Sequence, residues 1–273
     1  MEYIGKMKKF FLLFFFLIYI NTTLFSENLL FNPLNAYVFE PRIGSIINLN
    51  NDNLRLDIGA SFDLIRFENN QENLYNAIGA DFFTYTRLRS EPNFKFPVET
   101  SDYFFGINYS NKIIINNLEY ALRLRISHIS SHLVDGFSND GIFRQKPFIY
   151  SRELIELISI LKININENFD LKPILGGKYI FSTTPDSLTK LNYIIGLDYS
   201  YKFNNYIEFI GGIIIQNGEN TTNFSLQNGM KIKFIKNIGL FIGQYYYSGN
   251  SIHGMFYNNF DELNSIGFQI IYN

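Results

Sequence analysis

Apolar and polar residues alternate with a period of two along most of the chain. Between Leu54 and Leu64 every second residue is apolar, and the residues between them are charged, polar or small. Strict alternation of this kind indicates a β-strand with one apolar and one polar face. The segment is longer than the ~5–6 residues of a typical globular strand. The same two faces recur at 190–203 and 222–235.

The pattern predicts twelve strands. They cover residues 42–50, 54–68, 75–89, 101–113, 117–132, 148–163, 169–183, 190–203, 206–217, 222–235, 238–250 and 263–273. Short connections (69–74, 114–116, 164–168, 204–205, 236–237) alternate with longer ones (90–100, 133–147, 184–189, 218–221, 251–262). Bacterial outer-membrane barrels have an even strand number, short periplasmic turns and longer extracellular loops. We therefore expect an all-β fold, a twelve-stranded antiparallel transmembrane β-barrel of residues 42–273 in the bacterial outer membrane.

A soluble barrel or sandwich would show the same alternation with its apolar face inward. The strand length, the strand number and an export signal favour the membrane barrel, whose polar face lines the lumen. That face carries both signs of charge, at Arg55, Asp57, Asp63, Asp81, Arg87, Arg89, Arg123, Arg125, Glu156 and Lys178. A narrow lumen with mixed charges predicts a filled interior rather than a wide pore.

The N-terminus has the composition of a signal peptide. Three lysines between residues 6 and 9 precede an unbroken apolar run of 11 residues, 10–20. This run is shorter than the ~20 apolar residues that a transmembrane helix needs. We expect residues 1–26 to be a cleaved signal peptide, with a short membrane anchor as the alternative. Residues 27–41 are then a short periplasmic lead-in to the barrel.

Composition excludes several classes of protein. The 273 residues include 23 Lys and Arg and 25 Asp and Glu, giving a net charge of -2 without any basic block, so no nucleic-acid-binding surface is expected. The absence of cysteine excludes disulfides, thiolate metal sites and a cysteine nucleophile. The amphipathic last strand, with an aromatic residue near the C-terminus, resembles the assembly signal of outer-membrane proteins. The expected partners are thus outer-membrane lipid and, during biogenesis, the barrel-assembly machinery.

Candidate chemistry lies on the strand predicted at 117–132. Two arginines mark its polar face, so the alternation places His128, Ser130 and His132 on the lipid face. The order of short and long connections makes this strand run outward, which puts the three side chains near the extracellular rim. A histidine two positions from a serine on one strand face can serve as the base for that hydroxyl, which is otherwise a weak nucleophile.

The next predicted strand, 148–163, returns inward and supplies a carboxylate. Its lipid face carries Ser151 and Glu153, and the antiparallel hairpin brings Glu153 to the depth of His128. A carboxylate there would orient the imidazole, with Asp135 in the preceding loop as a weaker alternative. Arg152 is a candidate for holding an anionic headgroup. The predicted site residues are catalytic Ser130, His128 and Glu153 and substrate-binding Arg152, Ser151 and His132.

Other interpretations stay open. The same side chains suit a polar interfacial belt on a non-catalytic barrel that serves as a structural protein, a narrow pore or an adhesin. A metal site is not favoured, because four residues of strand separate His128 from His132 by about 13 Å, too far to share an ion. His253 falls in the last long loop, where we expect it to be solvated.

Several segments resemble an uncharacterised family. Residues 30–36 (Leu-Phe-Asn-Pro-Leu-Asn-Ala) and 40–44 (Glu-Pro-Arg-Ile-Gly) resemble the opening of domain-of-unknown-function family 1207. Residues 123–133 resemble its central motif and residues 150–153 its next one. The family usually continues His-Leu-Gly-Asp-Glu where residues 132–136 read His-Leu-Val-Asp-Gly, which weakens any role for an acid after that aspartate. The resemblance implies an outer-membrane location and no particular reaction.

The motif His128-x-Ser130 is also similar to the motifs of two outer-membrane lipid hydrolases. Lipid A 3-O-deacylase carries His-x-Ser on a lipid-facing strand and a Glu on the next strand. Outer-membrane phospholipase A carries His-x-Ser with an Asn as third member, twelve strands and calcium. The resemblance implies a lipid ester hydrolase in which Ser130 is the nucleophile and His128 the base, with Glu153 fitting the deacylase pattern better. It makes calcium a candidate cofactor, and no other cofactor is expected.

Overall fold

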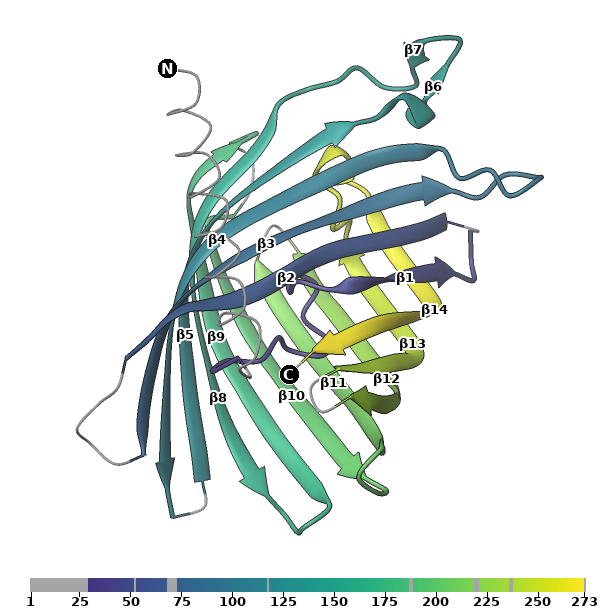
Figure 1. Cartoon of the computed structure of the whole chain (residues 1–273). Coiled ribbons are helices and arrows are strands. Elements are labelled where there is room, and N and C mark those ends of the chain that lie inside the picture. Colours follow the sequence, from purple (N-terminus) through teal and green to yellow (C-terminus); the bar gives the residue numbers. More distant parts are fainter. Residues whose placement is uncertain are drawn as a thin grey trace, which may run out of the picture.

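Twelve strands close into one antiparallel barrel in the computed structural model, which describes residues 29–51, 53–67, 73–116, 118–186, 189–218, 221–235 and 238–272 (Figure 1). The strands are β1 (Ile43–Asn48), β2 (Asn53–Phe67), β3 (Leu74–Arg89), β4 (Val98–Ile115), β5 (Leu118–Leu133), β8 (Tyr150–Asn164), β9 (Phe169–Thr184), β10 (Leu191–Lys202), β11 (Ile207–Gly218), β12 (Thr221–Ile235), β13 (Ile238–Asn250) and β14 (Phe260–Tyr272). Each pairs with its neighbours in sequence, and β1 closes the barrel against β14. The predicted fold is confirmed, while the expected signal peptide lies outside the described residues.

The two ends of the barrel differ in the length of their connections. The start of β1 lies beside the end of β14, with Ile43 paired to Ile270, at the end that holds the short turns. The opposite end carries the longest connections, together with the short ones that follow β1 and β11. The longest of these, between β5 and β8, contains the 3-10 turn η1 (Asp135–Phe137) and a small hairpin of β6 (Ser138–Asn139) and β7 (Ile142–Phe143) that projects from the barrel (Figure 1). This arrangement matches the predicted alternation of turns and loops.

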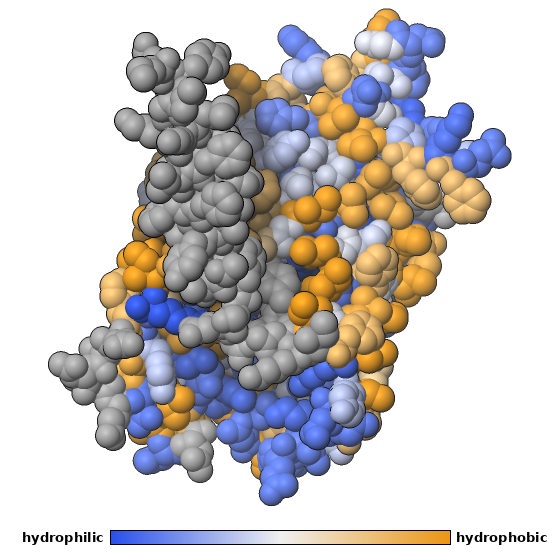
Figure 2. Space-filling view, in the orientation of Figure 1, coloured by the Kyte–Doolittle hydropathy of each residue, from blue (hydrophilic) through white to orange (hydrophobic). Residues whose placement is uncertain are grey.

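The outer wall of the barrel is apolar. Large hydrophobic side chains are exposed on strand after strand, including Ile58, Phe105, Ile107, Ile126, Leu175, Ile195, Ile215, Ile242 and Ile266. On the face seen in Figure 2, hydrophobic side chains gather across the middle and hydrophilic ones toward both ends. An outward apolar band between polar ends is what a bilayer requires of a barrel, and it places the protein in the outer membrane. No helix among the described residues is long and apolar enough to cross a membrane.

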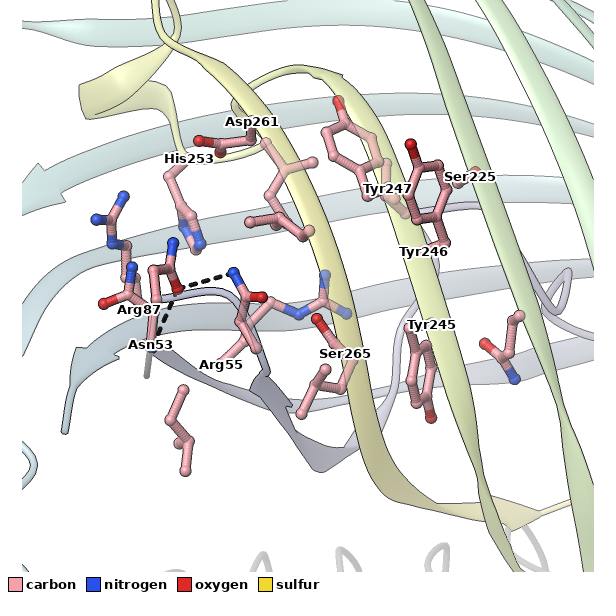
Figure 3. Close-up of a pocket in the computed structure, with 18 of the residues that line it drawn as sticks. Asn53, Arg55, Arg87, Ser225, Tyr245, Tyr246, Tyr247, His253, Asp261 and Ser265 are labelled. Atoms are coloured by element: carbon pink, nitrogen blue, oxygen red, sulfur yellow. Dashed lines mark hydrogen bonds between the residues drawn. The ribbon is translucent and has the colours of Figure 1, made fainter.

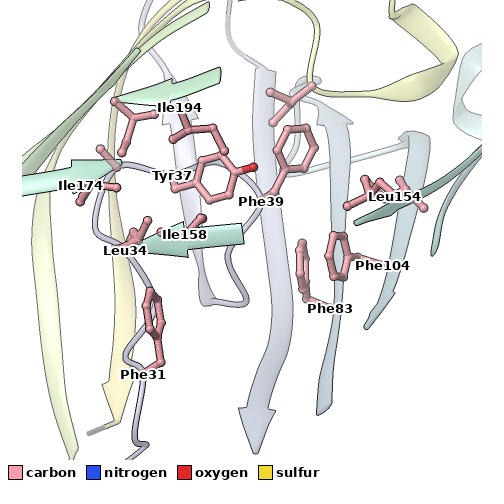
Figure 4. Packing of buried hydrophobic residues seen from close by; sticks show 14 of the residues in the cluster. Phe31, Leu34, Tyr37, Phe39, Phe83, Phe104, Leu154, Ile158, Ile174 and Ile194 are labelled. Atoms are coloured by element: carbon pink, nitrogen blue, oxygen red, sulfur yellow. The ribbon is translucent and has the colours of Figure 1, made fainter. Parts of the chain in front are cut away.

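Residues 29–41, the described part of the expected periplasmic lead-in, lie inside the barrel, so the periplasmic placement was wrong. Tyr37 and Phe39 are buried in a cluster with side chains such as Phe104 and Ile158 that point inward from the wall (Figure 4). The lumen face of the strands is therefore not uniformly polar. It carries apolar residues that bury the hydrophobic side chains of this segment, which would otherwise be exposed to water.

Buried charged side chains of the wall also contact the internal segment, residues 29–41. Arg123 lies 2.6 Å from Glu40, and Arg125 lies 2.7 Å from Glu156; all four side chains are almost completely buried. Tyr37 donates a hydrogen bond to Glu156 as well. Buried charges persist only when they are paired and hydrogen-bonded. The mixed charges of the lumen thus bind an internal segment that occupies part of the interior.

The connection between β13 and β14 folds into the loop-side mouth of the barrel. His253, on this connection, is buried, so the expectation that it is solvated was wrong. Its Nδ1 lies 2.7 Å from the carboxylate of Asp102, which also accepts the backbone N–H of Gly254 at 2.8 Å. Ser131 accepts the backbone N–H of Met255 at 3.1 Å. These contacts with β4 and β5 draw the loop inward.

Candidate functional site

The predicted pair of His128 and Glu153 forms on the outer face of the barrel. The register of β5 and β8 sets His128 directly opposite Glu153. The imidazole Nδ1 lies 3.0 Å from Glu153 Oε1, within hydrogen-bond distance. Both side chains are partly exposed, at 43% and 33%. The geometric prediction made from strand parity and the hairpin is therefore confirmed, and the bond leaves the imidazole Nε2 free to act as a base.

Ser130 lies on the same outward face, two residues along β5 from His128. It pairs with Ser151 on β8 and with Tyr103 on β4. Within the part of the chain that the structure describes, no hydrogen bond joins Ser130 to His128. Catalytic hydrogen bonds are often long in unliganded sites and tighten when substrate binds. Both side chains are partly exposed.

Two serine hydroxyls hold the carboxylate of Glu153. Ser151 donates to Oε1 at 3.0 Å, and Ser182 on β9 makes a further side-chain hydrogen bond. The register of β8 and β9 shifts just after Glu153, where β9 carries an extra residue at Phe181. Bulges of this kind redirect side chains and are frequent beside active sites. Ser151, predicted as a substrate contact, is thus hydrogen-bonded to the carboxylate of Glu153.

Aromatic side chains frame the site on β4. Phe105 pairs with His128 and Tyr103 with Ser130, and both rings are exposed on the outer wall. The ring of His132 lies 5.9 Å from that of Tyr103 and is exposed one residue before β5 ends. Aromatic rings with polar tips are typical of the boundary between hydrocarbon and headgroups. The site therefore occupies the loop-side edge of the apolar band.

Arg152 does not belong to this site. Its side chain is buried on the lumen face, and its guanidinium lies 4.8 Å from the centre of the Tyr150 ring. Successive residues of a strand point to opposite faces, so an arginine between Ser151 and Glu153 must face inward. The predicted role of Arg152 in holding a headgroup beside Ser130 is corrected by this placement.

Calcium is the cofactor that the resemblance to outer-membrane phospholipase A implies. The described residues contain no group of three or more His, Asp or Glu side chains arranged to hold a metal ion. No step below depends on calcium.

Solved structures with the same architecture are membrane barrels. An active-site variant of outer membrane phospholipase A from Escherichia coli is 15% identical in sequence, with 91% of this chain and 93% of that chain covered and a TM-score of 0.55. The transport unit of the autotransporter AIDA-I from Escherichia coli is 11% identical, with coverages of 84% and 88% and a TM-score of 0.51. The chain has the outer-membrane β-barrel fold. No protein-family model matches it, and no curated protein does.

Proposed function

We propose that the barrel is a serine ester hydrolase that deacylates lipid of the surrounding membrane. The observation that carries this proposal is the hydrogen bond between His128 and Glu153 on the lipid-facing wall, with Ser130 beside it. A nucleophile, a base and an orienting acid on one surface form the arrangement that activates a serine hydroxyl.

The proposed chemistry follows from the position of each atom. Glu153 accepts a hydrogen bond from Nδ1–H of His128, which leaves Nε2 to take the proton of Ser130 as the serine oxygen attacks the acyl carbonyl. The imidazolium then returns this proton to the leaving alcohol oxygen, and an acyl-serine remains. Water, deprotonated by the same imidazole, releases the fatty acid and restores the hydroxyl. Glu153 stabilises the positive charge on His128 in both steps.

The location of the site supports a lipid substrate. Below His128, the outer wall of β5 presents Ile126, which is 55% exposed. Charged or polar side chains on the lipid face are costly unless they lie near the interface. At this edge an acyl chain can lie along the apolar wall while its ester reaches Ser130. The exposed rings of Tyr103 and Phe105 offer additional apolar surface for the chain.

Two lipid classes are the candidate substrates. The acid at Glu153 supports the lipid A deacylase pattern, in which a Glu on the next strand is the third member. The fold shared with outer membrane phospholipase A supports a phospholipid, since that protein is a phospholipase by name. Both carry acyl esters of the kind that the proposed chemistry cleaves.

Fatty-acid release tests the proposal. The purified barrel is incubated with micelles of lipid A or of phosphatidylethanolamine, and mass spectrometry quantifies the products. We expect hydrolysis of at least one lipid, lowered by about a thousandfold or more in Ser130→Ala. Ser159→Ala is the matched control, because Ser159 faces outward on β8 and is hydrogen-bonded to Tyr120 rather than to a histidine. Equal activity of the Ser130 variant and the wild type would refute the proposal.

A further inference from the structure

A cavity of about 440 Å³ lies inside the barrel, separate from the lipid-facing site. Its walls come from β1, β2, β12, β13 and β14 and from the loop that carries His253 (Figure 3). Exposed Asn51 and Phe260 line it at the loop end, so it opens toward that end. The volume falls within the ~300–1,000 Å³ of small-molecule sites.

Two buried polar side chains in this cavity have no hydrogen-bond partner among the residues that the structure describes. Both amide atoms of Gln227 and the hydroxyl of Tyr245 are buried without a hydrogen bond in the described part of the chain. The two residues face each other in the register of β12 and β13, and both line the cavity. Buried polar groups almost always have a partner, so this pair marks a place for a ligand that donates and accepts hydrogen bonds.

The charge of the cavity points to an anion. Arg42 lines it and donates to the backbone oxygens of Asn35 and Tyr37, but among the described residues no carboxylate lies within 4.0 Å of its guanidinium. Arg55, by contrast, is paired with Asp57 at 2.7 Å. A buried cation without a counter-ion is costly, and an anionic ligand removes that cost.

Arg42, Gln227 and Tyr245 all line this cavity, so the unbalanced charge and the unpartnered groups share one space. We propose that the cavity binds a small hydroxylated organic anion, such as a sugar phosphate or a sugar acid. The anionic group would pair with Arg42, and its hydroxyls would bond Gln227 and Tyr245. Guanidinium groups suit phosphate and carboxylate geometry, and a hydroxyl both donates and accepts, as the glutamine amide requires.

Isothermal titration calorimetry on the detergent-solubilised barrel tests this proposal, with glucose 6-phosphate, glucuronate, inorganic phosphate and glucose as probes. We expect saturable 1:1 binding of glucose 6-phosphate or glucuronate and at least about tenfold weaker binding of glucose, since a charged hydrogen bond is worth more than a neutral one. Tyr245→Phe and Gln227→Met should each weaken binding about fivefold through the loss of one hydrogen bond.

Tyr85→Phe is the matched control. Tyr85 is also a buried, lumen-facing tyrosine whose hydroxyl has no partner among the described residues, but it does not line the cavity. Its variant should bind like the wild type. The proposal is overturned if neither anionic sugar binds, if glucose binds as tightly, or if Tyr245→Phe and Tyr85→Phe have the same effect. Because the cavity and Ser130 lie on opposite faces of the wall, Tyr245→Phe should leave lipid hydrolysis unchanged, so the two proposals can fail independently.

Discussion

Glu40 and Arg123 form an ion pair at the centre of the barrel, with Glu40 Oε1 2.6 Å from Arg123 Nη2 and both side chains almost fully buried. Glu40 lies just before the first strand, and Arg123 lies in the middle of β5. The pair therefore fastens the internal segment to the wall. Since Glu40 also lies 3.7 Å from Arg125, its carboxylate balances two buried cations.

Glu40→Gln should destabilise the barrel strongly. Removing one partner of a buried ion pair leaves an uncompensated charge and costs about 3–5 kcal/mol. Urea denaturation of the barrel in detergent, followed by circular dichroism, measures the free energy of unfolding. The control is Glu91→Gln, because Glu91 and Arg89 form a partly exposed pair, and pairs near the surface contribute about 0–1 kcal/mol. Equal losses in the two variants would show that residues 29–41 do not pack inside the barrel.

Single-cysteine labelling determines which end of the barrel faces the cell exterior, since the chain has no cysteine of its own. Asn139→Cys, on the exposed β6–β7 hairpin, should react with a membrane-impermeant maleimide on intact cells. Asn166→Cys, in the exposed turn between β8 and β9, should react only after the outer membrane is permeabilised. The reverse result would place the short turns outside and invert the topology.

The contact between Asp102 and His253 should hold the last loop in the mouth of the barrel. Met255 is 3% exposed, so Met255→Cys should react slowly with a maleimide. Adding Asp102→Ala removes the acceptor for both His253 and Gly254, and labelling should accelerate at least about tenfold as the loop opens. Adding Asp261→Ala provides a comparison, because Asp261 is a partly exposed acid at the start of β14. Equal labelling rates of Met255→Cys with Asp102→Ala and with Asp261→Ala would show that the contact between Asp102 and His253 does not hold the loop.

The strands and the pairing of His128 with Glu153 could be predicted because both follow from a period of two. The segments expected at 54–68 and 148–163 correspond to β2 at Asn53–Phe67 and β8 at Tyr150–Asn164. Parity puts Glu153 on the same face of the wall as His128, and the antiparallel order of β5 and β8 brings the two to a similar depth, where they are paired. The same rule places Arg152 in the lumen, so its assignment as a headgroup contact conflicted with the pattern that predicted its neighbours.

Other features could not be predicted, because they depend on where the chain packs rather than on its period. Ser182 reaches Glu153 only through the register shift beside Phe181, and parity has no signal for a bulge on the neighbouring strand. His253 sits in a loop whose sequence does not reveal that Asp102 draws it inward. The apolar residues of 29–41 are too few for a periodic pattern, yet they fill the lumen.

If Ser130, His128 and Glu153 act as the proposed triad, the effects of their substitutions on turnover should not be additive. Ser130→Ala and His128→Ala should each abolish nearly all turnover, and the double variant should lose little more, because the residues of a catalytic unit are strongly non-additive. Glu153→Gln should be milder, since the amide keeps the size of the side chain but stabilises the imidazolium less. Hydrolysis rates for the four variants, with circular dichroism to confirm folding, give the comparison. Additive losses would indicate that the side chains do not act together.

The central claim is that Ser130 is a nucleophile activated by His128. A long-chain fluorophosphonate reacts with such a serine by losing fluoride, and peptide mass spectrometry identifies the modified residue. We predict one adduct, on Ser130, that disappears in His128→Ala, while outward-facing Ser159 stays unmodified. The absence of any adduct on Ser130 in the folded wild-type barrel, or an equal yield in His128→Ala, would contradict the account.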